Sequence, residues 1–235
     1  METRFQGQVV LVAGGTGALG SAVSQAFLRE GADVFVSYRR SEEYEALKRA
    51  AASDGARLRG QQLDVTDEPA MRRTVVAIDT ELGRLDALIN TVGAYAGGAK
   101  LWDVTSAELE RMLNLNLRAA FVASRSVMPM LLKQRHGSIV SVAAKAAVDQ
   151  PGGAGAYVAS KAAVLALMHS LAIDAKGTGV RVNTVLPNII DTAANRRDMP
   201  QADFTNWTKV EEIANVILFL CSADARAING AAIPV

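Results

Sequence analysis

Short apolar runs alternate with helix-length segments along the chain, and this alternation constrains the fold more than any other feature. The runs lie at residues 9–13, 34–38, 85–90, 138–142 and 180–186, with weaker ones near 58–63 and 231–235. Continuous apolar strands joined by helices form a parallel sheet that is covered on both faces. Because such crossovers are right-handed, the pattern predicts one doubly wound α/β domain over residues 1–235, with a mostly parallel seven-stranded sheet.

Composition and charge narrow the classes of partner. The 235 residues carry 25 basic and 24 acidic side chains, which argues against a strongly basic nucleic-acid binder. Apolar runs such as residues 216–221 are far shorter than the roughly 20 residues that a bilayer requires. The N-terminus lacks the apolar stretch of a signal peptide. We therefore expect a cytoplasmic protein with a small-molecule substrate, no nucleic acid and no membrane.

A glycine-rich turn follows the first run. Gly14, Gly17 and Gly20 recur at a spacing of three, with Thr16 and Leu19 between them. Glycine allows the backbone to approach a pyrophosphate, and the helix that starts here directs free N–H groups toward the phosphates. The turn therefore predicts dinucleotide binding, and the alternative is a purely structural strand-to-helix turn.

Two arginines end the second run. Arg39 and Arg40 stand where NAD-binding chains place an acidic residue for the ribose hydroxyls. Guanidinium groups suit a 2′-phosphate, so this position favours NADP(H) over NAD(H). The alternative is a solvated start to the next helix, which Glu42 and Glu43 support.

Asp64 and Val65 follow the third run, where a carboxylate could meet the adenine amino group. The alternative for Asp64 is a helix cap. Both interpretations stay open at this point.

Tyr157 and Lys161 are four residues apart in an alanine-rich segment, which puts both side chains on one helix face. A nearby ammonium stabilises phenolate, so we expect a lowered tyrosine pKa and a role in proton transfer. The chain contains its own control, because Tyr44 and Lys48 share the spacing but lie on the helix after the second run, remote from any nicotinamide position.

These features together resemble the short-chain dehydrogenase/reductase family over nearly the whole chain. The motifs that carry the resemblance are Gly14/Gly17/Gly20, Asp64, Asn90-Thr91-Val92-Gly93, Asn116, Tyr157/Lys161 and Pro187 through Thr192. The resemblance implies a Rossmann-type fold and hydride transfer from a nicotinamide, with Tyr157 as proton donor and Lys161 binding ribose. Asn116 would hold a water in the proton relay, and its alternative is a helix-interior asparagine that bonds backbone.

The same resemblance assigns further positions. Pro187, Ile190 and Thr192 would lie against the nicotinamide, and Asn90 would brace the middle of the sheet. Helices near residues 104–133 and 151–176 would form a homo-oligomer interface, in a dimer or a tetramer. Family members commonly continue for several residues beyond the position of Val235.

One departure from the family is large. The catalytic serine of the family sits about thirteen residues before the tyrosine, and Ala144 occupies that position. Ser141 is the nearest substitute, but it is three residues early and on the strand. Losing one such hydroxyl donor can lower the rate on an ordinary carbonyl by about 10²–10³.

The dihydropteridine reductase subgroup likewise has alanine at this position. The sequence of this chain also resembles that subgroup in residues 96–98, 144–149 and 191–208. The resemblance implies a reductase of a conjugated carbonyl, quinonoid or pterin-like acceptor, since such an acceptor spreads its developing charge. Arg39 and Arg40 depart from that subgroup, whose acidic residue suits NADH, and they predict NADPH as the cofactor here. The alternatives are a general ketone or 3-oxoacyl reductase, and a catalytically weak NADP-binding sensor or regulatory protein.

The substrate loops are expected near residues 93–103 and 188–208. Tyr95 and Trp207 in these loops could stack on a flat substrate beside Ala144, or they could serve loop packing. His136 and His169 lack partners at metal-ligand spacing, so we expect no metal.

Overall fold

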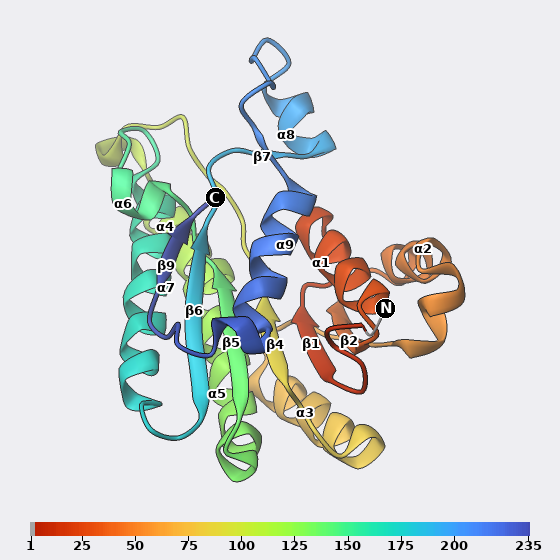
Figure 1. Cartoon of the computed structure of the whole chain (residues 1–235). Coiled ribbons are helices and arrows are strands. Elements are labelled where there is room, and N and C mark those ends of the chain that lie inside the picture. Colours follow the sequence, from red (N-terminus) through yellow and green to blue (C-terminus); the bar gives the residue numbers. More distant parts are fainter. Residues whose placement is uncertain (1–2) are drawn as a thin grey trace.

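The computed structural model describes residues 3–235 and contains a seven-stranded sheet in the order β3-β2-β1-β4-β5-β6-β9 (Figure 1). All neighbouring strands in it are parallel, which confirms the predicted doubly wound α/β architecture. The strands are β1 (Val9–Ala13), β2 (Asp33–Tyr38), β3 (Leu58–Gln62), β4 (Ala87–Asn90), β5 (Gly137–Val142), β6 (Val180–Leu186) and β9 (Ala232–Pro234).

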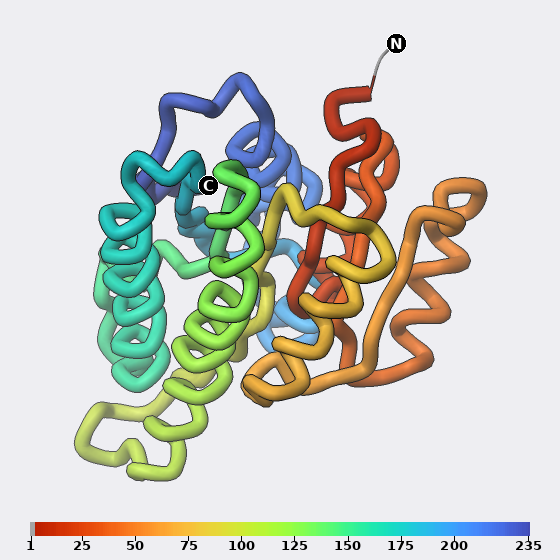
Figure 2. The backbone as a smooth tube through the Cα atoms, turned by 90° about the horizontal axis from the view of Figure 1, so that it is seen from below, coloured from red at the N-terminus to blue at the C-terminus, as the bar shows by residue number. Residues whose placement is uncertain are grey.

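Helices cover both faces of this sheet. The helices are α1 (Ala18–Arg29), α2 (Ser41–Ala50), α3 (Glu68–Leu82), α4 (Ser106–Met112), α5 (Ala119–Gln134), α6 (Ala146–Asp149), α7 (Gly155–Asp174), α8 (Ala193–Asp198) and α9 (Val210–Cys221). Figure 2 shows α3, α5 and α7 side by side, and they pack on one face. Helices α1, α2 and α9 pack on the other.

Strand β1 shows why both faces need cover. Its five residues are all buried, and successive side chains point to opposite faces. Val9 and Leu11 join the core under α3, α5 and α7, whereas Val10 and Val12 join the core under α1, α2 and α9. A strand in this position reads as a continuous apolar run, which is the pattern the sequence shows.

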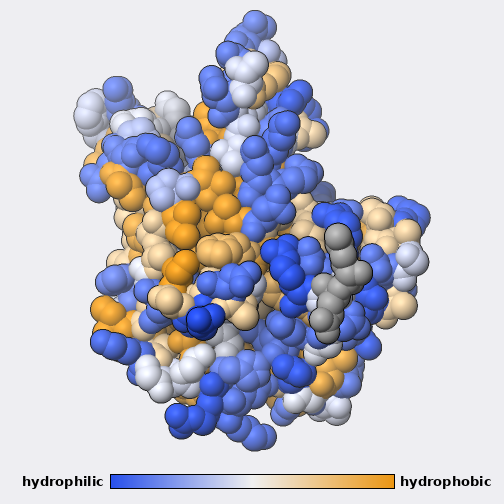
Figure 3. All heavy atoms as spheres, viewed as in Figure 1, coloured by the Kyte–Doolittle hydropathy of each residue, from blue (hydrophilic) through white to orange (hydrophobic). Residues whose placement is uncertain are grey.

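Two segments rise above the carboxyl edge of the sheet. One follows β4 and contains a 3₁₀ turn (Leu101–Asp103), and the other follows β6 and contains β7 (Ile190–Asp191), α8 and β8 (Thr208–Lys209). In the space-filling view the molecule is hollowed between two projecting lobes at this end (Figure 3). Ligands of doubly wound folds bind at this edge.

Helix α7 covers the sheet and is rich in apolar residues. Among residues 3–235 it is the one helix long and apolar enough to cross a membrane by length and composition, with a mean hydropathy of 1.5. Polar residues such as Lys161 interrupt the sequence of α7, so the helix contains no long unbroken apolar run. A share of 33% of the apolar stretch is buried, and α7 packs against β6. A core helix that covers a sheet has this same pattern.

Candidate active site

Tyr157 and Lys161 lie at the start of α7, beside the carboxyl end of β5. Tyr157 is half-buried, and Lys161 is only 6% exposed. The Lys161 Nζ donates a hydrogen bond of 3.0 Å to the carbonyl oxygen of Val142, the last residue of β5. The ammonium is thus held against the sheet edge, on the same helix face as the phenol.

Asn116 lies in a π-helical turn, Leu113–Arg118, between α4 and α5. Its Oδ1 accepts a hydrogen bond from the Ala94 N–H at 2.9 Å, and its Nδ2 donates to the Ala94 carbonyl at 3.0 Å and to Ser160 Oγ at 2.9 Å. The side chain therefore bonds backbone, as the alternative interpretation expected, and it holds the loop after β4 against α7. π-Turns of this kind are frequent at functional sites.

Gly93 is the point on which these groups converge. A Cβ at this position would lie 2.8 Å from Asn116 Oδ1 and 2.9 Å from Lys161 Nζ. No side chain fits between the amide and the ammonium without moving one of them. Glycine at this position keeps the loop close to both functional groups.

Burial shifts the two key pKa values in opposite directions. It raises the pKa of Tyr157 to about 12, with a further increase from Tyr95, and it lowers the pKa of Lys161 to about 8. The expected lowering of the tyrosine pKa by Lys161 is therefore wrong. The physical reason is that burial disfavours phenolate, while the ammonium is directed at Val142.

Ala144, the residue predicted to stand at the position of the family's serine, is enclosed. Ala144 is 6% exposed and directly precedes Lys145, whose N–H donates to the Pro187 carbonyl at 2.9 Å. Ser141 is fully buried, and its Oγ contacts Met168 Sδ at 3.2 Å. Met168 lies eleven residues beyond Tyr157 on α7, which is about 16 Å along the helix axis. Ser141 therefore does not take the place of the absent hydroxyl.

The glycine turn has the geometry of an anion site. Gly14 has a φ of +76°, and a Cβ on Gly20 would lie 2.1 Å from the Gly14 carbonyl oxygen. Gly17 is the N-cap of the 12-residue helix α1 and makes no side-chain capping bond. Gly17 is exposed, and the turn together with the first N–H groups of α1 could hold the phosphates of a dinucleotide.

Two hydroxyl groups that sequence reasoning missed anchor this turn. Ser37 Oγ of β2 accepts the Gly14 N–H at 2.9 Å. Thr91 Oγ1, after β4, donates to the carbonyl oxygens of Ala13 at 2.8 Å and Gly14 at 3.2 Å. Ser37 lies on β2 and Thr91 directly follows β4, and both strands are neighbours of β1 in the sheet. The order of the strands is therefore the signal that could have indicated these two hydroxyl groups.

The predicted adenosine side is exposed. Arg39 and Arg40 are both exposed, and Arg40 pairs with Glu43. Asp64 is exposed and accepts hydrogen bonds from the N–H and the hydroxyl of Thr66. Burial acts to raise the pKa of Asp64, but the Thr66 bonds and the charge of Arg39 outweigh it and lower the pKa.

Helix capping at α3 falls to Asp67 and not to Asp64, because Asp67 Oδ1 accepts the Ala70 N–H at 3.0 Å. The Val65 side chain is buried in the core. Only the backbone of Val65 is left to face a ligand.

The remaining predicted cofactor residues line the ends of β4 and β6. Asn90 is buried, and its Oδ1 accepts the Val92 N–H at 3.3 Å. The Ile190 carbonyl accepts from Asn195 Nδ2 at 2.8 Å. Thr192 caps α8, because its Oγ1 accepts the Asn195 N–H at 3.1 Å. These contacts place Thr192 at the base of the segment after β6.

Tyr95, Trp102 and Trp207 differ in their surroundings. Tyr95 is 68% exposed, and its ring packs edge-to-face on the ring of Tyr157 with centroids 4.9 Å apart. Trp102 is 82% exposed. Trp207 is only 8% exposed and packs against Phe204 at 4.7 Å, which favours the loop-packing interpretation. Tyr95 is therefore the aromatic side chain that borders the Tyr157 phenol.

A further observation is relevant to the site. Within residues 3–235, no group of three or more His, Cys, Asp or Glu side chains could hold a metal ion.

The control pair lies far from this site in the fold. Tyr44 stacks on Tyr38 and packs against the core on the face of the sheet opposite to α7. The two Tyr-x-x-x-Lys pairs thus lie on different faces of the sheet.

Comparison with known proteins agrees with this geometry. The profile of the short chain dehydrogenase family matches residues 8–203. A 3-oxoacyl-[acyl-carrier-protein] reductase from Thermotoga maritima is 30% identical over 240 residues, covering 99% of this chain and 97% of its own. Meso-2,3-butanediol dehydrogenase from Serratia marcescens is 32% identical, covering 99% and 94%.

The solved structures agree as well. An NAD⁺-bound xylitol dehydrogenase matches with a TM-score of 0.91 at 25% identity, covering 99% of this chain and 98% of its own. A levodione reductase matches with a TM-score of 0.91 at 28% identity, covering 99% and 97%. The chain belongs to the short-chain dehydrogenase/reductase family of oxidoreductases.

Proposed function

We propose that this chain is an NADPH-dependent reductase of a conjugated carbonyl, quinonoid or pterin-like acceptor, with Tyr157 as the proton donor. The observation that carries the proposal is the pair of half-buried Tyr157 and buried Lys161 at the carboxyl edge of the sheet, in a chain that has alanine at the position of the usual serine. The general reductase machinery is thus retained, while one hydroxyl donor for an alkoxide is absent.

The glycine turn and the residues after β4 and β6 would hold the nicotinamide cofactor, which supplies the hydride when bound. Gly14, Gly17 and Gly20 would face the phosphates, and Arg39 and Arg40 would favour NADP(H). Asp64 and the Val65 backbone would border the adenine. The nicotinamide half would be bordered by Asn90, Pro187, Ile190 and Thr192. Lys161 would bind the ribose of that half. The NAD⁺-bound xylitol dehydrogenase supports a nicotinamide dinucleotide.

Tyr157 suits the role of an acid. Its pKa of about 12 keeps the phenol protonated at neutral pH, so its Oη holds the proton that the reduced acceptor needs. Lys161, with a pKa of about 8, is largely charged at that pH. A cation on the same helix face stabilises the phenolate that remains after proton transfer. Asn116 keeps the loop after β4 in register with this pair.

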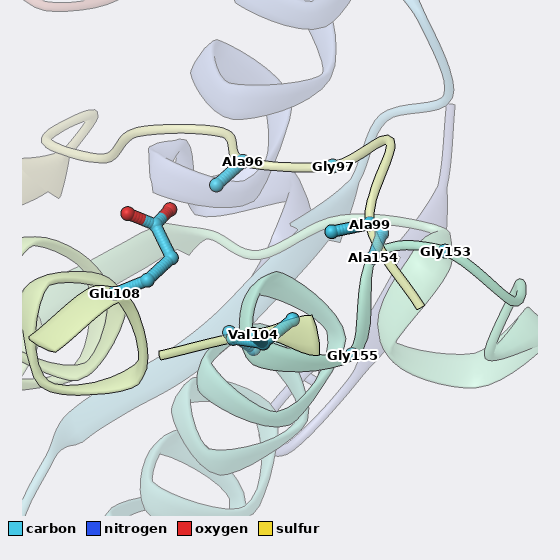
Figure 4. A pocket seen from close by; sticks show the side chains of 9 residues that line it. Ala96, Gly97, Ala99, Val104, Glu108, Gly153, Ala154 and Gly155 are labelled. Atoms are coloured by element: carbon cyan, nitrogen blue, oxygen red, sulfur yellow. The ribbon is translucent and has the colours of Figure 1, made fainter. Parts of the chain in front are cut away.

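A small cavity adjoins the start of α7. Its volume is about 170 Å³, close to an apolar cavity of about 150 Å³ that holds one benzene ring. It is lined by Ala96, Gly97, Ala99, Val104, Glu108, Gly153, Ala154, Gly155 and Ala156 (Figure 4). We assign the substrate loops to residues 93–103 and 188–208, with Tyr95 over the phenol and this cavity for a compact substituent.

The relatives favour a second candidate. Both the 3-oxoacyl-[acyl-carrier-protein] reductase and the butanediol dehydrogenase act on unconjugated oxygen groups by name, at 30% and 32% identity. A general ketone or 3-oxoacyl reductase is therefore the competing function. The alanine at position 144 distinguishes the two, since an ordinary carbonyl depends more on the missing hydroxyl.

We predict that NADPH oxidation is fastest with conjugated acceptors. In a panel of quinonoid dihydropterin, quinones and aliphatic ketones, kcat/KM should be highest for a quinonoid compound or a quinone. Ala144→Ser should raise kcat/KM for ketones by up to about 10²-fold and should change the quinonoid rates little. Ser141→Ala is the matched control, because Ser141 contacts Met168 and should not affect ketone turnover. Faster turnover of aliphatic ketones by the unmodified protein would exclude the proposal.

A homo-oligomer stays a prediction. A groove of about 470 Å³ lies between the α4–α5 segment and α7, and it includes Leu117, Phe121 and Leu167. Phe121 is exposed, as is Leu109 on α4. Apolar side chains gathered in this way support an interface between copies of the chain.

A further inference from the structure

A carboxylate from the first turn of α2 lies against the glycine turn. Glu43 Oε2 accepts a hydrogen bond from Thr16 Oγ1 at 3.1 Å, across 27 residues of sequence. The other oxygen, Oε1, pairs with the Arg40 guanidinium. The Glu43 side chain is 31% exposed, whereas that of Arg40 is 73% exposed. One carboxylate thus joins two elements that we assign to the cofactor.

The place of this carboxylate is set by the sheet. Ser37 of β2 accepts the Gly14 N–H through its hydroxyl and the Gly15 N–H, at 3.1 Å, through its carbonyl. The end of β2 and the glycine turn are therefore locked together. In doubly wound folds the adenosine ribose lies between these two elements, where its 2′ position is read. Thr16 belongs to the glycine turn, Arg40 follows β2, and Glu43 contacts both of them.

Local helix chemistry explains only part of this arrangement. An acidic residue in a first turn is favoured by the helix dipole, and an i,i+3 ion pair with Arg40 adds modest stability. Neither effect requires the contact with Thr16. Glu42 occupies the same turn and satisfies the dipole equally well. The Thr16 bond therefore indicates that Glu43 acts on the glycine turn as well as on its own helix.

The charges at this location oppose one another. A phosphate group on the ribose brings a charge of about −1.5 to −2 and accepts bonds from guanidinium groups. Glu43 already occupies Arg40 and repels a second anion. A ribose that carries only hydroxyl groups meets no such repulsion, since a hydroxyl can donate to the carboxylate. The Glu43 carboxylate thus disfavours the binding of NADP(H) and is compatible with the binding of NAD(H).

We propose that Glu43 competes with the 2′-phosphate of NADP(H) for Arg40 and so limits the preference for NADP(H) that the arginines create. This inference rests on the proposed function, because it takes a nicotinamide dinucleotide as the ligand of the glycine turn. Glu43 is then a specificity-determining residue, and it supplies from α2 the acidic group that the end of β2 lacks.

Calorimetric titration of the full chain with NADP⁺ and NAD⁺ tests the inference without any substrate. Glu43→Gln should lower the Kd for NADP⁺ by about tenfold, an effect that salt should reduce, and should leave the Kd for NAD⁺ unchanged or raised. Glu42→Gln is the matched control, because it removes the same charge from the same turn without breaking the Thr16 or Arg40 contact. Its ratio of the two Kd values should stay close to that of the unmodified protein.

A double-mutant cycle isolates the competition for Arg40. In an Arg40→Gln background, Glu43→Gln should lose most of its effect on NADP⁺, whereas full persistence of the effect would overturn the competition. An unchanged Kd ratio in Glu43→Gln, or equal changes in both glutamate variants, would overturn the inference and leave the proposed function standing. Failure of NADP⁺ and NAD⁺ to bind any variant, with folded protein verified by circular dichroism, would overturn both.

Discussion

Replacing Tyr157 with phenylalanine is expected to lower kcat by about 10²–10⁴ while cofactor binding is retained. The substitution removes the only proton that the phenol can donate and keeps the ring that packs edge-to-face on Tyr95. Because the pKa of Tyr157 lies near 12, the group is an acid throughout the neutral range, and its loss should not be rescued by mild changes of pH. Steady-state NADPH oxidation and calorimetric cofactor titration together measure the two effects.

The chain provides a matched control for this experiment. Tyr44 has the same Tyr-x-x-x-Lys spacing, stacks on Tyr38 and packs against the opposite face of the sheet. Tyr44→Phe keeps that stacking and should leave kcat unchanged. Equal rates for Tyr157→Phe and the unmodified protein would remove Tyr157 from the mechanism. An inactive parent that still binds cofactor would favour the sensor interpretation.

Replacing Lys161 with methionine is expected to abolish most reductase activity and to increase stability at neutral pH. The pKa of Lys161 falls from 10.5 in the unfolded chain to about 8 on burial. A shift of that size corresponds to roughly 3 kcal/mol of destabilisation by the buried charge. Methionine leaves the Val142 carbonyl without its donor, at about 1 kcal/mol. The free energy of unfolding in urea should therefore rise by about 2 kcal/mol at pH 7.

The sign of the pH dependence follows from proton binding. Between pH 8 and pH 10.5 the unfolded chain binds more protons at this lysine than the folded protein does, so the stability contributed by this group rises with pH. Lys161→Met lacks that rise, so its advantage should be full below pH 8 and should be lost before pH 10.5, where only the cost of the missing Val142 hydrogen bond remains. Tyr157 contributes the opposite slope only between pH 10 and about 12, where its raised pKa makes the folded protein bind the extra proton.

Lys48→Met serves as the control, because Lys48 is exposed on α2 and also follows a tyrosine, Tyr44, by four residues. It should change neither stability at pH 7 nor its slope. A Lys161→Met protein that is less stable than its parent at pH 7 would contradict a buried charge at this site. The expected pair of effects is a trade between activity and stability, which is frequent where a charged group is held in a low-dielectric site.

Much of the site could be predicted from the sequence because its signals are local. The apolar runs mark strands that are buried on both faces, and their positions agree with β1 and β6 residue for residue. The four-residue spacing of Tyr157 and Lys161 sets their common helix face, and the glycine spacing marks the turn before α1. The prediction that a catalytic serine is missing likewise rests on one position, Ala144.

Other predictions needed information that no local pattern holds. Whether Trp207 would stack on a ligand or fill a loop depended on Phe204, and the structure buries it. The direction of the Tyr157 pKa depended on how much of the phenol the fold would enclose and on where the Lys161 ammonium would point. Burial is a sum over neighbours from several elements, so spacing along one helix could not decide it.

The sequence by itself determined the order and type of the elements, the glycine turn and the Tyr157–Lys161 pair, since each follows from periodicity or residue type within a few positions. Only the tertiary structure decided that Asn116 pairs with Ala94 across 22 residues and that Glu43 reaches Thr16 across 27. The physical reason is that parallel strands bring their carboxyl ends to one edge regardless of separation in sequence. Contacts made there depend on the packing of the whole sheet.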